Sequence, residues 1–348
     1  MPARYALVLL AIALAGCIPD LSGYSLVEPG QDGGPPPGQD AGSGTPNPID
    51  LGVPCPNPHL LIGMVSGSSS TARVLRVDPA TRTACRTSAL LELQPAFGSR
   101  IADVDWHPAT GAILGLDEAV LGLDAGGFPA WRHDPFGYGG FGGDWVVVFG
   151  SGASARIAVA WTERSSSLET LRLIDASGFA TGADIPLPWS RDLIAAHPDG
   201  SGRILLASKS GMDVEVYTVG DATTELTTAS ASPLWTGAID LDAGYRYHLA
   251  SDLGTQRLVV THQEGLAFWQ VGGPAPTSVI QCPAYCSGFH AAASDPHADN
   301  AAYALCTDAS GSGKRHLVHL AATCTLVVDG TSLGAHTMQD VALVRAAL

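Results

Sequence analysis

The stretch TMQDVALVRAAL, residues 337–348, decides the fold of this chain. From Val341 onward the run has the apolar character of a β-strand, and no further strand signal follows it in the sequence. A lone strand leaves its backbone N–H and C=O groups without partners. We therefore expect this strand to pair with one from a distant part of the chain.

Short apolar runs separated by Gly, Pro and Asp turns fill the sequence from residue 59 onward, without helical periodicity. A similar turn follows a strand every 45 to 51 residues, at Asp78, Asp124, Asp175, Gly220, Val271 and Leu320. Asp followed by small residues suits a tight turn between antiparallel strands. Because a four-stranded propeller blade takes about 40 to 50 residues, this spacing predicts six blades.

A second element recurs ahead of these turns, an apolar strand that opens with a polar residue. Its copies are IADVDWHP (101–108), GGDWVVVF (142–149), SRDLIAAHP (190–198), YRYHLASD (245–252), GFHAAASDP (288–296) and MQDVALV (338–344). Five copies precede a turn, the last precedes none, and the turn at Asp78 has no copy before it. We expect the last strand to complete the blade of residues 59–92 and to close the ring. The predicted fold is all-β, a six-bladed β-propeller closed by its C-terminal strand; a seven-bladed propeller and a β-sandwich are the alternatives.

The turns resemble those of quinoprotein and YVTN/NHL-type propellers, and LDAGGFPAW (123–131) is the nearest copy. The resemblance extends over residues 59–348. It implies propeller architecture and no particular family.

Residues 1–16 have the features of a signal peptide, because Arg4 precedes an apolar run of about eleven residues, too short to span a bilayer. The segment closes on LAGC (14–17), which resembles the bacterial lipobox. That resemblance implies a lipoprotein in which Cys17 carries diacylglycerol and palmitate-type acyl chains that anchor it to a membrane. Ile18 after the cysteine favours the outer membrane, on its periplasmic or its surface face. An ordinary signal peptide with a chance cysteine is the alternative.

Residues 17–54 comprise the lipidated cysteine and a linker rich in Gly, Pro and Asp. Such a segment cannot bury enough apolar surface to fold, so we expect a disordered tether with a mean reach on the order of 35 Å. The β-propeller then takes residues 55–348. The formal net charge of −15 argues against nucleic acid or an anionic lipid surface as a partner.

Lipidation of Cys17 leaves six cysteines, an even number that suits disulfides in an oxidising compartment: Cys55, Cys85, Cys282, Cys286, Cys306 and Cys324. Cys55 precedes the second strand of the first blade and Cys85 begins its outer strand. Antiparallel order brings those two strand ends together, so we expect Cys55 to pair with Cys85. The pairing of the other four stays open, and a zinc site is the weaker alternative because the cysteine spacing lacks a matching second pair.

Polar residues stand near the start of all six first strands, and four of them are Asp103, Asp144, Asp192 and Asp340, with His248 and His290 on the other two. First strands line the channel of a propeller, so these side chains could hold Ca²⁺ or another cation there. The six-bladed sugar-lactonase-like hydrolases hold a channel metal with Glu, Asn and Asp, and this chain lacks the Glu and Asn. Hydration of the channel mouth is the structural alternative.

The segment WRHDPFGYGGFGGDW (131–145) joins the second and third predicted blades and alternates aromatic residues with glycines. The candidate binding residues are Trp131, His133, Phe136, Tyr138 and Phe141. Exposed aromatic side chains on a loop suit recognition of a protein or a glycan, whereas packing between blades is the alternative.

No phosphate loop, nucleophile elbow or readable acid–base pair stands in the sequence. We therefore expect a monomeric, non-enzymatic lipoprotein of the cell envelope whose propeller binds a protein or a glycan through its loop rim. The first alternative is a metal-dependent hydrolase with the channel aspartates as ligands. A quinone-dependent dehydrogenase is a second, implied by the turn resemblance.

Overall fold

The structure is a computed structural model. It describes residues 26–27, 55, 59–66, 71–88, 90–92, 100–116, 119–124, 126–134, 141–149, 155–163, 169–182, 184–187, 192–198, 204–210, 213–219, 233–238, 248–254, 257–262, 264–276, 279–295 and 297–344.

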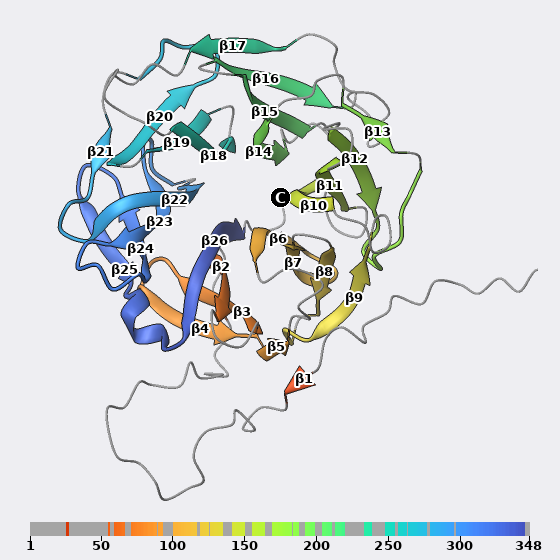
Figure 1. Ribbon diagram of the computed structural model, residues 1–348, viewed down its shortest axis with the longest axis horizontal. Helices are drawn as coiled ribbons and strands as arrows, with labels where there is room; N and C mark the ends of the chain where they lie inside the picture. The colour runs from red at the N-terminus through yellow and green to blue at the C-terminus, as the bar shows by residue number, and fades with distance from the viewer. Residues whose placement is uncertain are drawn as a thin grey trace, which may run out of the picture.

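Six antiparallel sheets stand around a central axis as the blades of a propeller (Figure 1), which confirms the predicted fold. The innermost strands of blades 1 to 6 are β26 (His336–Val344), β6 (Ile101–His107), β10 (Phe141–Phe149), β14 (Asp192–Pro198), β18 (His248–Asp252) and β22 (Cys286–Ser294). The second strands are β2 (His59–Ser66), β7 (Gly111–Leu116), β11 (Arg156–Glu163), β15 (Ile204–Ser210), β19 (Arg257–His262) and β23 (Ala302–Asp308).

The two outer positions follow the same order. The third strands are β3 (Thr71–Asp78), β8 (Val120–Leu123), β12 (Glu169–Ile174), β16 (Asp213–Val219), β20 (Gly265–Gln270) and β24 (Arg315–Leu320). The outermost strands are β4 (Thr83–Thr87) with β5 (Leu90–Glu92), β9 (Pro129–His133), β13 (Ile185–Pro186), β17 (Trp235–Ala238), β21 (Ile280–Gln281) and β25 (Cys324–Val328). A short 3₁₀ helix, η4 (Gly330–Leu333), connects blade 6 to β26.

Blade 1 is built from both ends of the propeller sequence, as the unpaired last strand predicts. β26 pairs antiparallel with β2, from His59 opposite Val344 to Ser66 opposite His336. The closing strand thus gives the inner edge of blade 1 its hydrogen-bonding partners. At the outer edge of the same blade, β1 (Leu26–Val27), which comes from the predicted linker, pairs with β5.

The recurring turn lies between the third and fourth strands of the blades. In blades 2 and 3 the Oδ1 atoms of Asp124 and Asp175 accept hydrogen bonds from backbone N–H groups inside the turn, at 2.9 Å from Phe128 and 2.8 Å from Ser177. The Asp side chain thereby closes the turn, which explains why this residue type recurs there. The corresponding Gly220 of blade 4 lies outside the described residues.

The core consists of side chains that pack between neighbouring blades. All of β2 is buried, and its alternate side chains face opposite sides. Leu60 and Ile62 belong to a cluster shared with blade 6, whereas Leu61 and Val65 belong to one shared with blade 2. Each such leucine contributes about 1.5–3 kcal/mol by burial. The ring is therefore stabilised by apolar contacts between neighbouring blades.

Three disulfides are formed, Cys55–Cys85, Cys282–Cys324 and Cys286–Cys306, with Cα–Cα distances of 5.3, 5.6 and 5.4 Å. The first is the pair expected from the strand order. The other two, which the sequence left open, both lie in blade 6 and its entrance.

Candidate functional site

A β-bulge interrupts each of the six strands that surround the axis (Figure 1). In each, a residue has no Cα partner on the second strand of its blade: Ala102, Asp144, Ile194, Ser251, His290 and Gln339. Bulges redirect side chains and occur often at barrel rims and next to functional sites. Along the strands that line the channel, the regular alternation of side-chain direction is therefore interrupted.

Asp103 and Asp340 each follow a bulge residue directly, and they meet between blades 1 and 2. Asp340 Oδ2 and Asp103 Oδ1 both accept a hydrogen bond from the Val104 N–H, at 2.9 Å each. Asp103 Oδ2 accepts a second one from the Val146 N–H of blade 3 at 2.7 Å. The two carboxyl groups lie close enough for Asp103, when protonated, to donate a hydrogen bond to Asp340. This chain of contacts links three consecutive blades at the axis.

Burial and mutual repulsion set the charge of this pair. Asp103 retains only 8% of its exposure, and Asp340 is half-buried. Burial raises the pKa of Asp340 to about 6, although Arg100 opposes the shift. Burial, followed by the charge of Asp340, raises the pKa of Asp103 well above its ordinary value. The pair therefore binds protons at a higher pH in the folded state than two isolated carboxyl groups would.

Two further inner-strand acids bridge neighbouring blades in the same way. Asp105 Oδ2 accepts from the Val148 N–H of blade 3 at 2.6 Å. Asp252 Oδ2 accepts from the Ser294 N–H of blade 6 at 2.5 Å. We did not select Asp105 and Asp252 from the sequence, although the alternation DVD at 103–105 places Asp103 and Asp105 on one face of the strand. These carboxylates satisfy backbone donors that would otherwise face the channel.

The four predicted metal ligands do not share one register. Asp103 and Asp340 stand one residue after the bulge, Asp144 is the bulge residue, and Asp192 lies two residues before Ile194. The side chains of Asp144 and Asp192 lie outside what the structure describes. Among the described side chains, no group of three or more His, Cys, Asp and Glu has the geometry of a metal site.

The two channel histidines have separate surroundings. His290 Nε2 lies 2.6 Å from Thr307 Oγ1, and burial together with the Arg315 charge lowers its pKa to about 4. The imidazole is therefore neutral at physiological pH. His248 is the first residue of β18, and its side chain is outside the described part of the chain.

The aromatic segment 131–145 is fixed at its beginning. Trp131 is 4% exposed and packs over two glycines, Gly122 of its own blade and Gly178 of blade 3. A Cβ atom at these glycines would lie 2.2 and 2.6 Å from the indole ring, so both positions require glycine. His133 Nδ1 lies 2.9 Å from the Gly178 carbonyl oxygen. Trp131 and His133 therefore join blade 2 to blade 3.

Of the remaining aromatic candidates, Phe136 and Tyr138 lie outside the described residues, and Phe141 begins β10 with its side chain not described. The lipobox with Cys17 also lies outside them. Over the residues that are described, no helix has the length and hydrophobicity needed to cross a membrane.

No protein-family model and no curated protein matches this chain. Solved structures do resemble it. A protein of unknown function from Bacteroides caccae is 12% identical, with 83% of this chain and 99% of that chain covered and a TM-score of 0.50. This likeness concerns the fold alone. Raptor from Chaetomium thermophilum (13% identity, 79% of this chain and 26% of that chain, TM-score 0.46) and the six-bladed fucose-recognising lectin of Aleuria aurantia (13%, 80% and 97%, 0.39) are more distant.

Proposed function

We propose that this chain is a lipid-anchored protein of the bacterial cell envelope, most closely associated with the outer membrane. In this proposal its propeller binds a protein or a glycan through loops on one rim. The lipobox ending at Cys17 supports the location, and the segment between Cys17 and β1, which pairs with blade 1, would connect the lipid anchor to the propeller.

The observation that carries the binding role is the fixed base of the aromatic segment. Trp131 is buried against blade 3, and Arg132, itself buried, pairs with Asp134 at 2.5 Å. The chain then passes from the outermost strand of blade 2 to the innermost strand of blade 3. Loops that a rigid scaffold positions are common binding elements, and aromatic side chains are enriched at interfaces. Phe136 and Tyr138 on this connection are the proposed contact residues.

The location is tested by expressing the wild-type chain and Cys17→Ser in a bacterium fed a palmitate analogue. We expect the label and membrane association in the wild type, and loss of both in the serine variant. Outer and inner membranes are then separated to place the protein. Membrane association that persists in Cys17→Ser would contradict a lipid anchor at this residue.

Recognition is tested with glycan arrays and with envelope extracts passed over the purified protein. Replacing Phe136 and Tyr138 by Ser should weaken capture by about 30-fold or more if they are central contacts. Leu234→Ser is the control, because Leu234 is 55% exposed beside β17 of blade 4, which the aromatic segment does not join. An equal loss of capture in the control, or no loss of capture in the double variant, would contradict recognition through Phe136 and Tyr138.

A channel cation is the competing hypothesis, and Asp103 and Asp340 are the residues that would hold it. Both carboxyl groups already accept backbone hydrogen bonds, which favours a structural role. Elemental analysis of the purified protein, with melting temperatures measured with and without EDTA, decides between them. A stoichiometric divalent ion with loss of stability on chelation would favour the hydrolase.

A further inference from the structure

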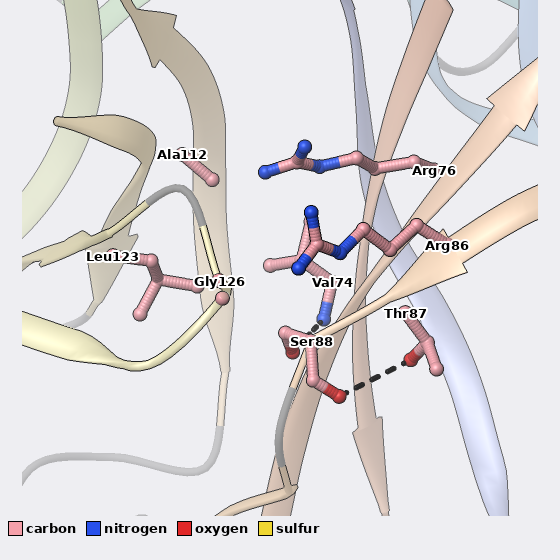
Figure 2. A pocket seen from close by; sticks show the side chains of 9 residues that line it. Val74, Arg76, Arg86, Thr87, Ser88, Ala112, Leu123 and Gly126 are labelled. Atoms are coloured by element: carbon pink, nitrogen blue, oxygen red, sulfur yellow. Dashed lines mark hydrogen bonds between the residues drawn. The ribbon is translucent and has the colours of Figure 1, made fainter. Parts of the chain in front are cut away.

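Two arginine side chains extend side by side into a pocket between blades 1 and 2 (Figure 2). Arg76 lies on β3 and Arg86 on β4, and they are direct Cα partners across the two strands. Residues directly opposite in an antiparallel pair share one face of the sheet, where like charges destabilise the pairing. This arrangement therefore costs stability unless another group compensates for the charges.

Carboxylates within the described part of the chain do not compensate for them. The ion pairs formed by arginines there involve Arg132, Arg172 and Arg257, and none involves Arg76 or Arg86. The charge balance makes this unusual, because the protein has 33 acidic and only 18 basic residues. Burial, and then the charge of Arg86, lower the pKa of Arg76. Two positive charges thus stand together without an ion-pair partner among the described residues.

A stacking contact positions Arg76 while leaving its donors available, and a disulfide fixes the backbone next to Arg86. The Arg76 guanidinium lies over the Trp106 ring of blade 2, 4.6 Å from its centroid. Such stacking covers the face of the guanidinium and leaves the N–H groups on its edge. Arg86 directly follows Cys85, whose disulfide to Cys55 fixes β4. Fixed donors lose little conformational freedom on binding, which favours affinity.

The recess next to the guanidinium groups has an enclosed space of about 10 Å³, close to that of one water molecule, so only the charged end of an anion would enter it. The opposite wall is formed by small or apolar residues of blade 2, Ala112, Leu123, Gly126 and Gly127 (Figure 2). Val74, Thr87 and Ser88 line the blade 1 side. A forked oxyanion matches the paired N–H donors of an arginine, and two adjacent arginines can hold one anion from two directions.

We propose that Arg76 and Arg86 form a binding site for an oxyanion, a phosphate, sulfate or carboxylate group. The site lies at the turn before β9, whereas the aromatic segment leaves from the end of β9, so the two sites are at opposite ends of that strand. The oxyanion site is independent of the proposed rim function.

The test uses the whole mature chain with its disulfides intact and three probes, inorganic phosphate, sulfate and acetate, at constant ionic strength balanced with chloride. Calorimetry measures binding and fluorescence measures the melting temperature. We expect at least one probe to bind the wild type and to raise its melting temperature by about 3 °C near saturation. The probe that binds distinguishes a tetrahedral anion from a planar carboxylate.

Arg86→Gln is the test variant, and Arg82→Gln is the matched control, because it removes the same charge from an exposed turn of the same blade. Arg86→Gln should weaken anion binding by about 10- to 100-fold while the control binds as the wild type does. Phosphate and sulfate stabilise proteins in general by exclusion from their surfaces, so only the difference between the variants counts.

The melting temperature in chloride distinguishes a loss of anion binding from a general loss of folding stability in the variant. Because Arg86→Gln removes a like-charge contact, its melting temperature in chloride alone should equal or exceed that of the wild type. The proposal is overturned if no probe binds the wild type, if Arg86→Gln binds as well as the wild type, or if Arg86→Gln melts below the wild type in chloride.

Discussion

Replacing Asp340 by Asn removes the titratable group at this position of the axial carboxyl pair but leaves an amide that can still form hydrogen bonds. The Asn Oδ1 atom can still accept from the Val104 N–H, as Asp340 Oδ2 does at 2.9 Å. In the wild type protonated Asp103 is the donor of this pair, whereas in the variant the Asn NH₂ group can donate to Asp103. The variant therefore keeps residue 340 uncharged at every pH.

The expected magnitude follows from the pKa of Asp340, which burial raises from 3.8 to about 6. A folded pKa above the unfolded value means that the folded state holds the proton more tightly. The stability that protonated Asp340 contributes is then fully present below about pH 4 and is lost as the pH rises through 6. A rise of this size corresponds to about 3 kcal/mol. The neighbouring charges are Arg100, Arg315 and Asp105, and the arginines reduce the loss.

Urea unfolding followed by tryptophan fluorescence between pH 4 and pH 8 measures the effect. Asp340→Asn should match the wild type at pH 4 and exceed its unfolding free energy by about 2–3 kcal/mol at pH 8. Asp103→Asn is the control, because Asp103 uses both oxygens as acceptors, for Val104 and Val146, and Asn offers only one. That control should be less stable than the wild type at pH 4, and the deficit should shrink as the pH rises, because it too removes a carboxyl group of raised pKa. A difference between Asp340→Asn and the wild type that does not change with pH would refute the raised pKa of Asp340.

Three further variants test the contacts between blades and the disulfide of blade 1. Gly178→Ala forces a Cβ atom to 2.6 Å from the Trp131 ring at a φ of 82°, so we expect a loss of about 2–4 kcal/mol in urea unfolding, and a wild-type curve would contradict the packing. Replacing Cys55 and Cys85 by Ala removes a crosslink over 30 residues and should cost about 3–4 kcal/mol, measured against the wild type with its disulfides intact; equal unfolding free energies would contradict a stabilising crosslink. Asp252→Ala leaves a backbone N–H of β22 without its acceptor and should cost about 1–3 kcal/mol; an unchanged melting temperature would show that water replaces the carboxylate.

The architecture was predictable because propeller blades repeat a turn whose chemistry is local. Asp124 and Asp175 close their turns with their own side chains, so the turn can be identified from the sequence even where the rest of the blade shows no similarity. The unpaired last strand then required closure with β2. The bulges of the inner strands had no comparable signal, because a single extra residue in a short apolar strand leaves its composition unchanged.

The site residues were only partly predictable, for the same physical reason. The sequence identified Asp103 and Asp340 as channel acids, but a bulge next to each decides which neighbour its side chain meets. A one-residue offset reverses the direction of a strand side chain, and Asp144 is offset by that one residue. The proximity of Arg76 and Arg86 was not predicted, because it depends on the register of two strands.

Both like-charge contacts of this protein that we describe lie at one interface, between blades 1 and 2. Asp103 and Asp340 meet there at the axis, and Arg76 and Arg86 meet there farther out, with Trp106 of β6 packed against Arg76. This interface joins the closing strand to the first complete blade, so its charges act on the closure of the ring. A proton relieves the repulsion at the axis and an anion would relieve it at the pocket. Asp340→Asn should therefore change the response of stability to pH and leave the response to phosphate, whereas Arg86→Gln should do the reverse.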